Sequence, residues 1–120
     1  IAHVARVGGE LGADIVKCPY TGDIKSMRRV TESCPAPVVI AGGPKCENDY
    51  EVLKMVEDAM AAGTIGISLG RNIFQHARPD LMTAALRSVI IDGISAKQAS
   101  SILTGYVKAE PAEHMTMAMH

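Results

Sequence analysis

The segment Val38-Val-Ile-Ala-Gly-Gly43 turns an apolar, β-branched run into two glycines, and two other segments change character in the same way. Ala13-Asp-Ile-Val-Lys-Cys18 ends in a lysine and a cysteine, and Gly66-Ile-Ser-Leu-Gly-Arg-Asn72 passes into a glycine and an arginine. Buried parallel strands are near-continuous runs of Val, Ile and Leu, and α/β proteins place their chemistry at the carboxyl ends of such strands. The pattern therefore predicts three parallel strands, at 13–18, 38–41 and 64–69, with functional groups where each one ends.

Helical periodicity fills the stretches between and after these strands. It predicts helices over 2–11 and 24–32, a helix that begins at Asn48 or Asp49 and stops at Gly63, and a short helix within 70–75. Two longer helices follow, one beginning at Pro79 and one capped by Ser95. The repeat of about 25 to 28 residues is typical of parallel strands joined by crossover helices.

The length limits how much of such a fold the chain can build. A complete (β/α)8 barrel needs about 250 residues, whereas this chain has 120. We therefore expect an α/β chain that forms the C-terminal half of a TIM (β/α)8 barrel, with about three parallel strands. Residues 1–107 are expected to belong to this domain, and residues 108–120 to form a poorly ordered tail.

Composition and charge exclude several classes of protein. The formal net charge is −1, with acidic and basic residues mixed along the chain, so no electrostatic footprint for nucleic acid or an anionic membrane is visible. No apolar run approaches the ~20 residues that span a bilayer. Because the chain shows neither such a run nor a signal-peptide layout, we expect a cytoplasmic protein. The three cysteines form no Cys-x-x-Cys motif and the four histidines show no metal-ligand spacing, so we expect reduced thiols and no metal site.

Lys17 is the candidate nucleophile. A lysine that closes a buried strand lies at the mouth of an apolar cavity, where desolvation can free its amine for attack on a carbonyl. The alternative is a lysine at a strand end whose ammonium simply reaches water.

Glycines at two neighbouring strand ends are the candidate phosphate site. Gly42 and Gly43 leave the backbone open to an anion, and Gly70 does the same while Arg71 adds a cation. The alternative is that each glycine merely permits a tight turn. Lys45 is a possible further cation, although an exposed loop lysine explains it equally well.

Two polar residues follow Lys17 closely. Tyr20 and Asp23 are a possible proton donor and its partner. A turn at Gly22 and a helix cap at Asp23 account for this segment adequately, and we favour that interpretation.

Three motifs in this order resemble a known family. Gly12-Ala-Asp-Ile-Val-Lys-Cys-Pro-Tyr-Thr-Gly-Asp23, Cys34-Pro-Ala-Pro-Val-Val-Ile-Ala-Gly-Gly-Pro-Lys45 and Gly70-Arg-Asn-Ile-Phe-Gln-His76 are similar to segments of the class I, Schiff-base aldolases. The resemblance is to the deoxyribose-phosphate aldolase and archaeal-type fructose-bisphosphate aldolase group. Within it, the motifs are nearest to 2-amino-3,7-dideoxy-D-threo-hept-6-ulosonate synthase and the phospho-autoinducer-2 thiolase. It covers roughly residues 1–92.

The resemblance implies an enzyme that acts on a phosphorylated ketose, without a metal or an organic cofactor. Lys17 matches the Schiff-base lysine, and Gly42, Gly43, Gly70 and Arg71 match phosphate-binding positions. The family's assisting aspartate and its tyrosine or other acid/base group belong to strands that this chain does not contain. We accordingly expect a homo-oligomeric lyase or aldol-type transferase that is inactive as this chain alone.

Two other functions remain open at this stage. One is a thiolase or another phosphosugar barrel enzyme in which Lys17 polarises a carbonyl without a covalent bond. The other is an inactive half-barrel that only binds phosphate.

Overall fold

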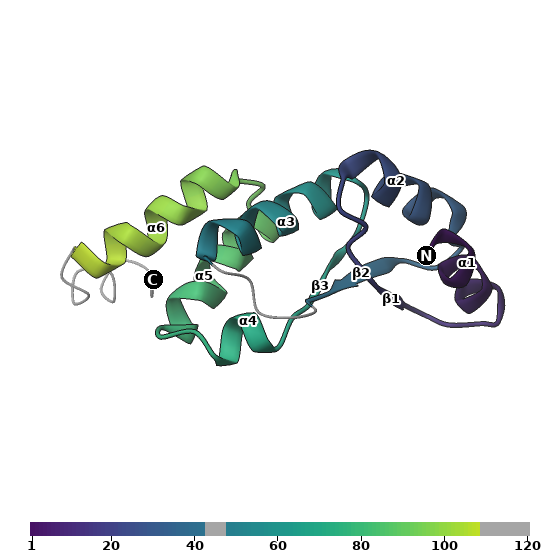
Figure 1. Ribbon diagram of the computed structural model, residues 1–120, viewed down its shortest axis with the longest axis horizontal. Helices are drawn as coiled ribbons and strands as arrows, with labels where there is room; N and C mark the ends of the chain where they lie inside the picture. The colour runs from purple at the N-terminus through teal and green to yellow at the C-terminus, as the bar shows by residue number, and fades with distance from the viewer. Residues whose placement is uncertain (43–47, 109–120) are drawn as a thin grey trace.

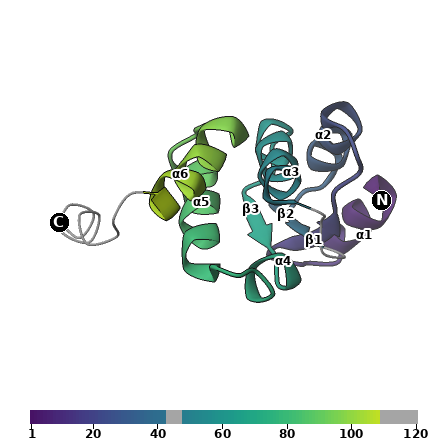
Figure 2. The ribbon, with the colours of Figure 1, turned by 60° about the vertical axis from the view of Figure 1, so that its left-hand side comes forward.

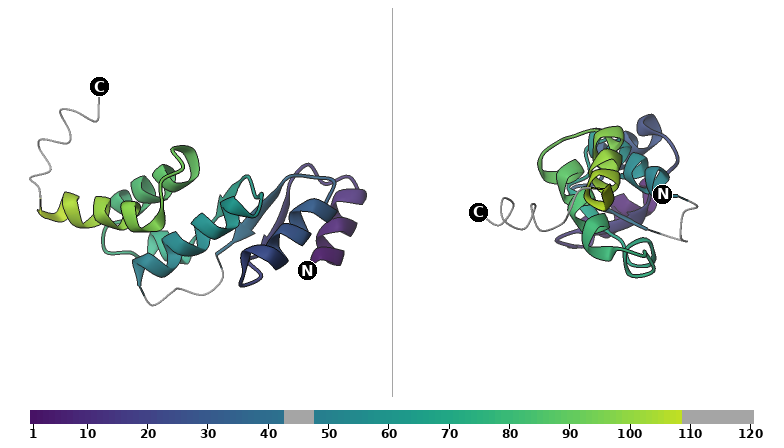
Figure 3. Two further views of the ribbon diagram at one scale, coloured as in Figure 1. Left: turned by 90° about the horizontal axis from the view of Figure 1, so that it is seen from above. Right: turned by 90° about the vertical axis from the view of Figure 1, so that its left-hand side faces the viewer.

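The computed structural model describes residues 1–42 and 48–108, which form six helices and three strands within these ranges. In chain order they are α1 (Ala2–Glu10), β1 (Val16–Pro19), α2 (Ile24–Ser33), β2 (Val38–Ala41), α3 (Asp49–Ala61), β3 (Gly66–Ser68), α4 (Arg71–Phe74), α5 (Pro79–Ile91) and α6 (Ala96–Lys108). Figure 1 shows the sheet below α2 and α3, and Figure 3 shows the chain running along the long axis from α1 towards α6.

The strands form one parallel sheet in the order β1-β2-β3. Lys17 is in register with Val39, and Val39 with Gly66, so these three residues form one row across the sheet. Strand–helix–strand order with neighbouring parallel strands confirms the expected α/β architecture with three parallel strands.

The two faces of the sheet differ in what covers them. Cys18, Val38 and Ile40 are buried in a core cluster with residues of α1, α2 and α3, such as Ala5 and Met27. Alternation along a strand sends the intervening side chains to the other side. That side, the open face, consists of residues that are exposed or half-buried: Lys17, Pro19, Val39, Ala41, Gly66 and Ser68.

Side-chain caps fix the helix starts close to where the sequence places them. Asp23 Oδ1 accepts from the Ser26 backbone N–H at 2.8 Å, and Asn48 Oδ1 accepts from Glu51 N–H at 2.9 Å. Ser95 Oγ accepts from Gln98 N–H at 3.1 Å at the start of α6. These bonds satisfy donors that have no partner inside the helix. They confirm the predicted caps Asp23 and Ser95 and the predicted start of α3 at Asn48 or Asp49.

Two strands are shorter than the sequence predicts. β1 begins at Val16 and β3 at Gly66, whereas Ala13 and Thr64 were expected to start them. Ala13 N–H donates to Gly8 O at 3.2 Å, and Thr64 N–H donates to Ala59 O at 3.2 Å. Both residues therefore close the preceding helix and cannot open a strand.

A second core cluster joins the C-terminal helices. Leu53 and Val56 of α3, Met82 and Leu86 of α5, and Ala99 of α6 are all buried together. Among the described residues, no helix is long and apolar enough to cross a membrane. The tail expected after the last helix falls on residues 109–120, which lie outside the described part of the chain, while Lys108 is still helical.

Candidate functional site

Lys17 lies on the open face, at the second position of β1. Pro19, two residues further on, is still paired with Ala41, so the expectation that Lys17 closes its strand is wrong. The side chain is exposed, and no helix in the described ranges covers this face. The desolvation expected from the sequence is therefore not supplied by the described residues, because the apolar contacts of β1 lie on the opposite face.

The surroundings of Lys17 leave room for a ligand. Val39 and Gly66 continue its row across the sheet, and a Cβ on Gly66 would have no heavy atom within 4 Å. No ion pair among residues 1–42 and 48–108 engages Lys17. Lys17 also contributes to a cavity of about 430 Å³ between β1 and α1, with Val4 and Gly8 on the helix side.

Gly42 and Gly70 follow β2 and β3 at the same edge of the sheet, and Figure 2 shows α4 next to the carboxyl end of β3. Gly42 comes directly after Ala41, three residues beyond the partner of Lys17, or about 10 Å along the strand at ~3.3 Å per residue. Arg71 opens α4 with an exposed side chain, and no ion pair in the described ranges involves it. The structure thus brings Gly42, Gly70 and Arg71 to the edge above Lys17.

Two of the residues predicted for this site, Gly43 and Lys45, lie outside the described residues. Their assignment to phosphate binding stays a prediction.

Tyr20 and Asp23 are not brought to Lys17. Tyr20 packs against the core cluster on the helix-covered side, where its buried hydroxyl has no hydrogen-bond partner among residues 1–42 and 48–108. Desolvation, together with the charges of Asp58 and Asp23, raises the pKa of Tyr20. Asp23 caps α2, where the Ser26 backbone N–H and hydroxyl lower the pKa of the carboxyl. The favoured interpretation, in which Asp23 is a helix cap, is therefore confirmed.

Two polar features at the carboxyl edge were not predicted as functional. Asn72 follows Arg71 and is buried, with 2 % of its surface exposed. Its position between Arg71 and two apolar residues was a signal for a buried polar group. His76 Nε2 lies 2.9 Å from Asp49 Oδ1, a pair whose 27-residue separation leaves no signal in the sequence.

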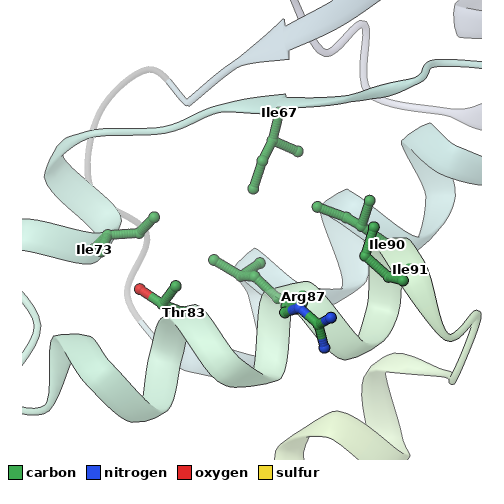
Figure 4. Close-up of a pocket in the computed structure, with 7 residues that line it drawn as sticks. Ile67, Ile73, Thr83, Arg87, Ile90 and Ile91 are labelled. Carbon is green, nitrogen blue, oxygen red and sulfur yellow. The ribbon is translucent and has the colours of Figure 1, made fainter.

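An apolar cavity of about 330 Å³ lies on the other side of β3. Figure 4 shows Ile67 of β3 opposite Ile90 of α5, with Ile73 of α4 at one end. Of the described residues that line this cavity, Thr83 and Arg87 are the polar ones. It is a gap in the packing between β3 and α5, distinct from the face that carries Lys17.

The described cysteines are thiols. Cys18 and Cys34 are buried and free, and burial together with the neighbouring Cys34 raises the pKa of Cys18. No group of three or more His, Cys, Asp or Glu side chains able to hold a metal ion occurs within 1–42 and 48–108.

Comparison with known proteins identifies similar sequences and folds. The sequence model described as DeoC/LacD family aldolase matches residues 1–76. The chain is 45% identical over 92 residues to 2-amino-3,7-dideoxy-D-threo-hept-6-ulosonate synthase of Halobacterium salinarum, which covers 77% of this chain and 34% of that protein. It is also 39% identical to 3-hydroxy-5-phosphonooxypentane-2,4-dione thiolase of an Enterobacter species, over 79% of this chain and 31% of that protein. The chain thus spans about a third of the length of these relatives.

A solved structure shows the same arrangement of elements. It is an archaeal fructose-1,6-bisphosphate aldolase with its catalytic Lys covalently bound to the carbinolamine intermediate of the substrate. The superposition has a TM-score of 0.73 at 36% identity and covers 75% of this chain and 36% of that one. The three parallel strands and their helices are therefore part of a TIM barrel, as the sequence predicted.

Proposed function

Because the chain belongs to the DeoC/LacD family of aldolases, we propose that it supplies the Schiff-base lysine and part of the phosphate site of a class I aldolase. The observation that carries the proposal is the position of Lys17. Its amine is exposed on the open face, has no ion-pair partner in the described ranges, and lies below the edge where Gly42 and Arg71 are found. The similar structure with a covalently bound catalytic Lys supports this assignment.

The chemistry follows from an accessible primary amine. The neutral amine of Lys17 attacks the carbonyl carbon of a ketose, and the resulting carbinolamine loses water to form an iminium ion. A base removes the proton of the hydroxyl group on the β carbon, and the bond between the α and β carbons breaks, so that the β carbon leaves as an aldehyde. The electron pair of that bond forms the C=C bond of an enamine, while the iminium π pair moves to the nitrogen. Protonation of the enamine and hydrolysis release the ketone product and restore the amine. In the synthetic direction the enamine attacks an aldehyde instead.

A phosphorylated ketose is the proposed substrate class. The backbone at Gly42 and Gly70 and the guanidinium of Arg71 would bind the phosphate at the carboxyl edge. Binding there would fix the carbonyl over Lys17, and such positioning lowers the activation free energy of the attack by several kcal/mol. The names of the similar proteins favour a substrate similar to fructose 1,6-bisphosphate or to the precursors of 2-amino-3,7-dideoxy-D-threo-hept-6-ulosonate.

The acid/base group of the reaction would come from outside the described residues. Tyr20 packs on the helix-covered side and Asp23 caps α2, so neither offers a proton to a substrate on Lys17. We therefore propose that activity needs the remaining strands of the barrel. We also propose a cytoplasmic homo-oligomer, which the two reduced, buried thiols and the exposed apolar side chains of α1 favour.

Borohydride trapping tests the covalent step. The chain is joined to the remaining strands of a relative's barrel, incubated with fructose 1,6-bisphosphate and reduced, and a peptide map then locates the added mass. We expect it on Lys17, and we expect Lys17→Arg to fold normally without being modified. Lys25, which is also exposed, serves as an internal control for non-specific reaction. Modification elsewhere, or turnover without any trapped adduct, contradicts the Schiff-base assignment.

A thiolase-like or non-covalent reaction is the second candidate, and the Enterobacter thiolase is the observation that favours it. In a non-covalent enzyme, borohydride leaves activity unchanged and Lys17→Arg retains part of the turnover. A chain that binds phosphate but neither traps substrate nor supports retro-aldol cleavage in the completed barrel would be a binding fragment only.

A further inference from the structure

The hydrogen bond between Asp49 and His76 joins the two segments that follow β2 and β3. Asp49 is the first residue of α3, and His76 lies two residues beyond the end of α4. The bond from Asp49 Oδ1 to His76 Nε2 is 2.9 Å long, and the His76 side chain is 15% exposed. It connects elements that are 27 residues apart in sequence.

A second hydrogen bond fixes the orientation of the imidazole. His76 Nδ1 accepts from the backbone N–H of Arg78 at 2.8 Å. Since Nδ1 is then an acceptor, Nε2 carries the proton and donates it to Asp49. The carboxylate of Asp49 is also favoured at the N-terminus of α3 by the helix dipole. Both ends of the link are thus held by their own elements.

Backbone hydrogen bonds connect His76 to Arg71. His76 N–H donates to Ile73 O at 3.1 Å, Gln75 N–H donates to Arg71 O at 3.1 Å, and Ile73 N–H donates to Gly70 O at 2.9 Å. Backbone hydrogen bonds therefore connect His76 to the segment that carries Gly70 and Arg71. At the other end, α3 is anchored through Val52, Leu53 and Val56, which are buried in the core cluster with α5 and α6.

We propose that Asp49 and His76 form a positioning link, which holds the segment bearing Gly70 and Arg71 against the start of α3 so that Arg71 and the backbone at Gly42 face one phosphate. This inference rests on the proposed phosphate site. Neither residue touches the phosphate; both act through Arg71. Because Arg71 has no ion-pair partner in the described ranges, its placement depends on the segment that carries it.

Inorganic phosphate is the probe, titrated into the 120-residue chain at constant ionic strength and followed by NMR chemical shifts. Asp49→Ala removes both the charge and the acceptor, whereas Asp49→Asn removes the charge and keeps an acceptor oxygen for His76. We expect Asp49→Ala and His76→Ala each to raise the Kd about three- to tenfold, and Asp49→Asn to stay within about twofold of wild type. The double alanine variant should be no weaker than either single one.

Two controls separate positioning from general damage. Asp80→Ala breaks an exposed ion pair with Arg78, just beyond His76 in the chain, and should leave the Kd unchanged. Thermal unfolding confirms that each variant is folded at the titration temperature, and Asp49, with 45% of its side chain exposed, is the substitution that the fold tolerates more easily.

The outcomes distinguish the link from the site it serves. If Arg71→Ala abolishes phosphate binding while Asp49→Ala and His76→Ala bind like wild type, the link is overturned and the phosphate site stands. If Asp49→Asn binds phosphate as weakly as Asp49→Ala, the hydrogen bond between Asp49 and His76 does not position Arg71. If the wild-type chain binds no phosphate, or Arg71→Ala binds it equally well, both the phosphate site and the inference fail.

Discussion

Gly42 lies so close to Leu69 that a Cβ on Gly42 would stand 2.7 Å from Cδ2 and 3.4 Å from Cα of the leucine. Gly42 follows β2, and Leu69 follows β3 in the neighbouring position. The glycine therefore has a packing role that is independent of any ligand. Gly70, one residue after Leu69, differs: a Cβ there would meet nothing within 4 Å, and no positive φ requires a glycine.

The contrast between Gly42 and Gly70 gives the first prediction. Gly42→Ala should lower the free energy of unfolding by about 1 kcal/mol, because the Leu69 side chain must shift to admit the methyl group. Gly70→Ala should leave stability nearly unchanged and weaken phosphate binding, because a methyl group would occupy the open space above the edge. Urea denaturation measures the first effect and phosphate titration the second. Equal phosphate affinity in Gly70→Ala and wild type would mean that Gly70 is only a turn residue.

Local signals in the sequence were enough to predict the strand–helix order, the caps at Asp23 and Ser95, and the start of α3 at Asn48 or Asp49. Asp23, Asn48 and Ser95 cap helices by short-range geometry that their residue types favour. The predicted starts of β1 and β3 were wrong, because the end of the preceding helix and the start of the strand compete for the same residue. Ala13 and Thr64 belong by composition to the following strand, but each donates its N–H back to a helix that ends at a left-handed glycine.

Long-range contacts could not be predicted in the same way. Asp49 meets His76, and Glu57 meets the backbone of Ala96, only after the helices have packed. The exposure of Lys17 has a similar cause. The sequence shows that Lys17 belongs to an apolar strand. Only the fold shows that the apolar side chains of this strand lie on the opposite face of the sheet.

The cap at Asp23 predicts a pH dependence of stability. The Ser26 backbone N–H, and then the Ser26 hydroxyl, lower the pKa of the Asp23 carboxyl in the folded chain. A lowered folded-state pKa stabilises the fold above the unfolded value of about 3.9 and loses this contribution as pH falls through the folded-state value. Asp23→Asn keeps the acceptor oxygen but cannot ionise. Wild type should be more stable than this variant at pH 7, and the difference should vanish towards pH 2.

Urea denaturation of wild type and Asp23→Asn across this pH range makes the measurement. Asp14→Asn is the matched control, since Asp14 is an exposed carboxylate that lies outside the helices. A constant difference between wild type and Asp23→Asn at every pH would contradict an ionised cap.

Glu57 links α3 to the start of α6. Its Oε1 accepts from the backbone N–H of Ala96 at 2.8 Å, and Ala96 is fully buried. Glu57→Ala leaves that N–H without its acceptor and should cost about 1.5 to 3 kcal/mol of unfolding free energy. Glu57→Gln keeps an acceptor oxygen and should cost less. Hydrogen exchange at the Ala96 amide provides a local measurement, and protection there in Glu57→Ala as strong as in wild type would rule out this role.

The apolar surface of α1 predicts self-association of the isolated chain. Val4 is 72% exposed, and Leu11, at the end of the helix, is 82% exposed. Val4 lies beside β1, a strand at the edge of the described sheet, and an unpaired edge is a template for another chain. We expect concentration-dependent association, measured by size-exclusion chromatography with light scattering. Because both side chains are exposed, Val4→Lys and Leu11→Lys should reduce association without lowering stability.

A matched substitution on the same helix tests whether the apolar side chains are responsible. Arg6 and Glu10 form an exposed ion pair on α1, so Arg6→Gln should leave association unchanged while it alters the charge of the helix. A wild-type chain that is monomeric at all concentrations and cleaves fructose 1,6-bisphosphate would overturn both this prediction and the need for further barrel strands. If instead the Lys variants are monomeric, stable and inactive, the apolar surface drives association, and catalysis depends on groups that these described residues do not provide.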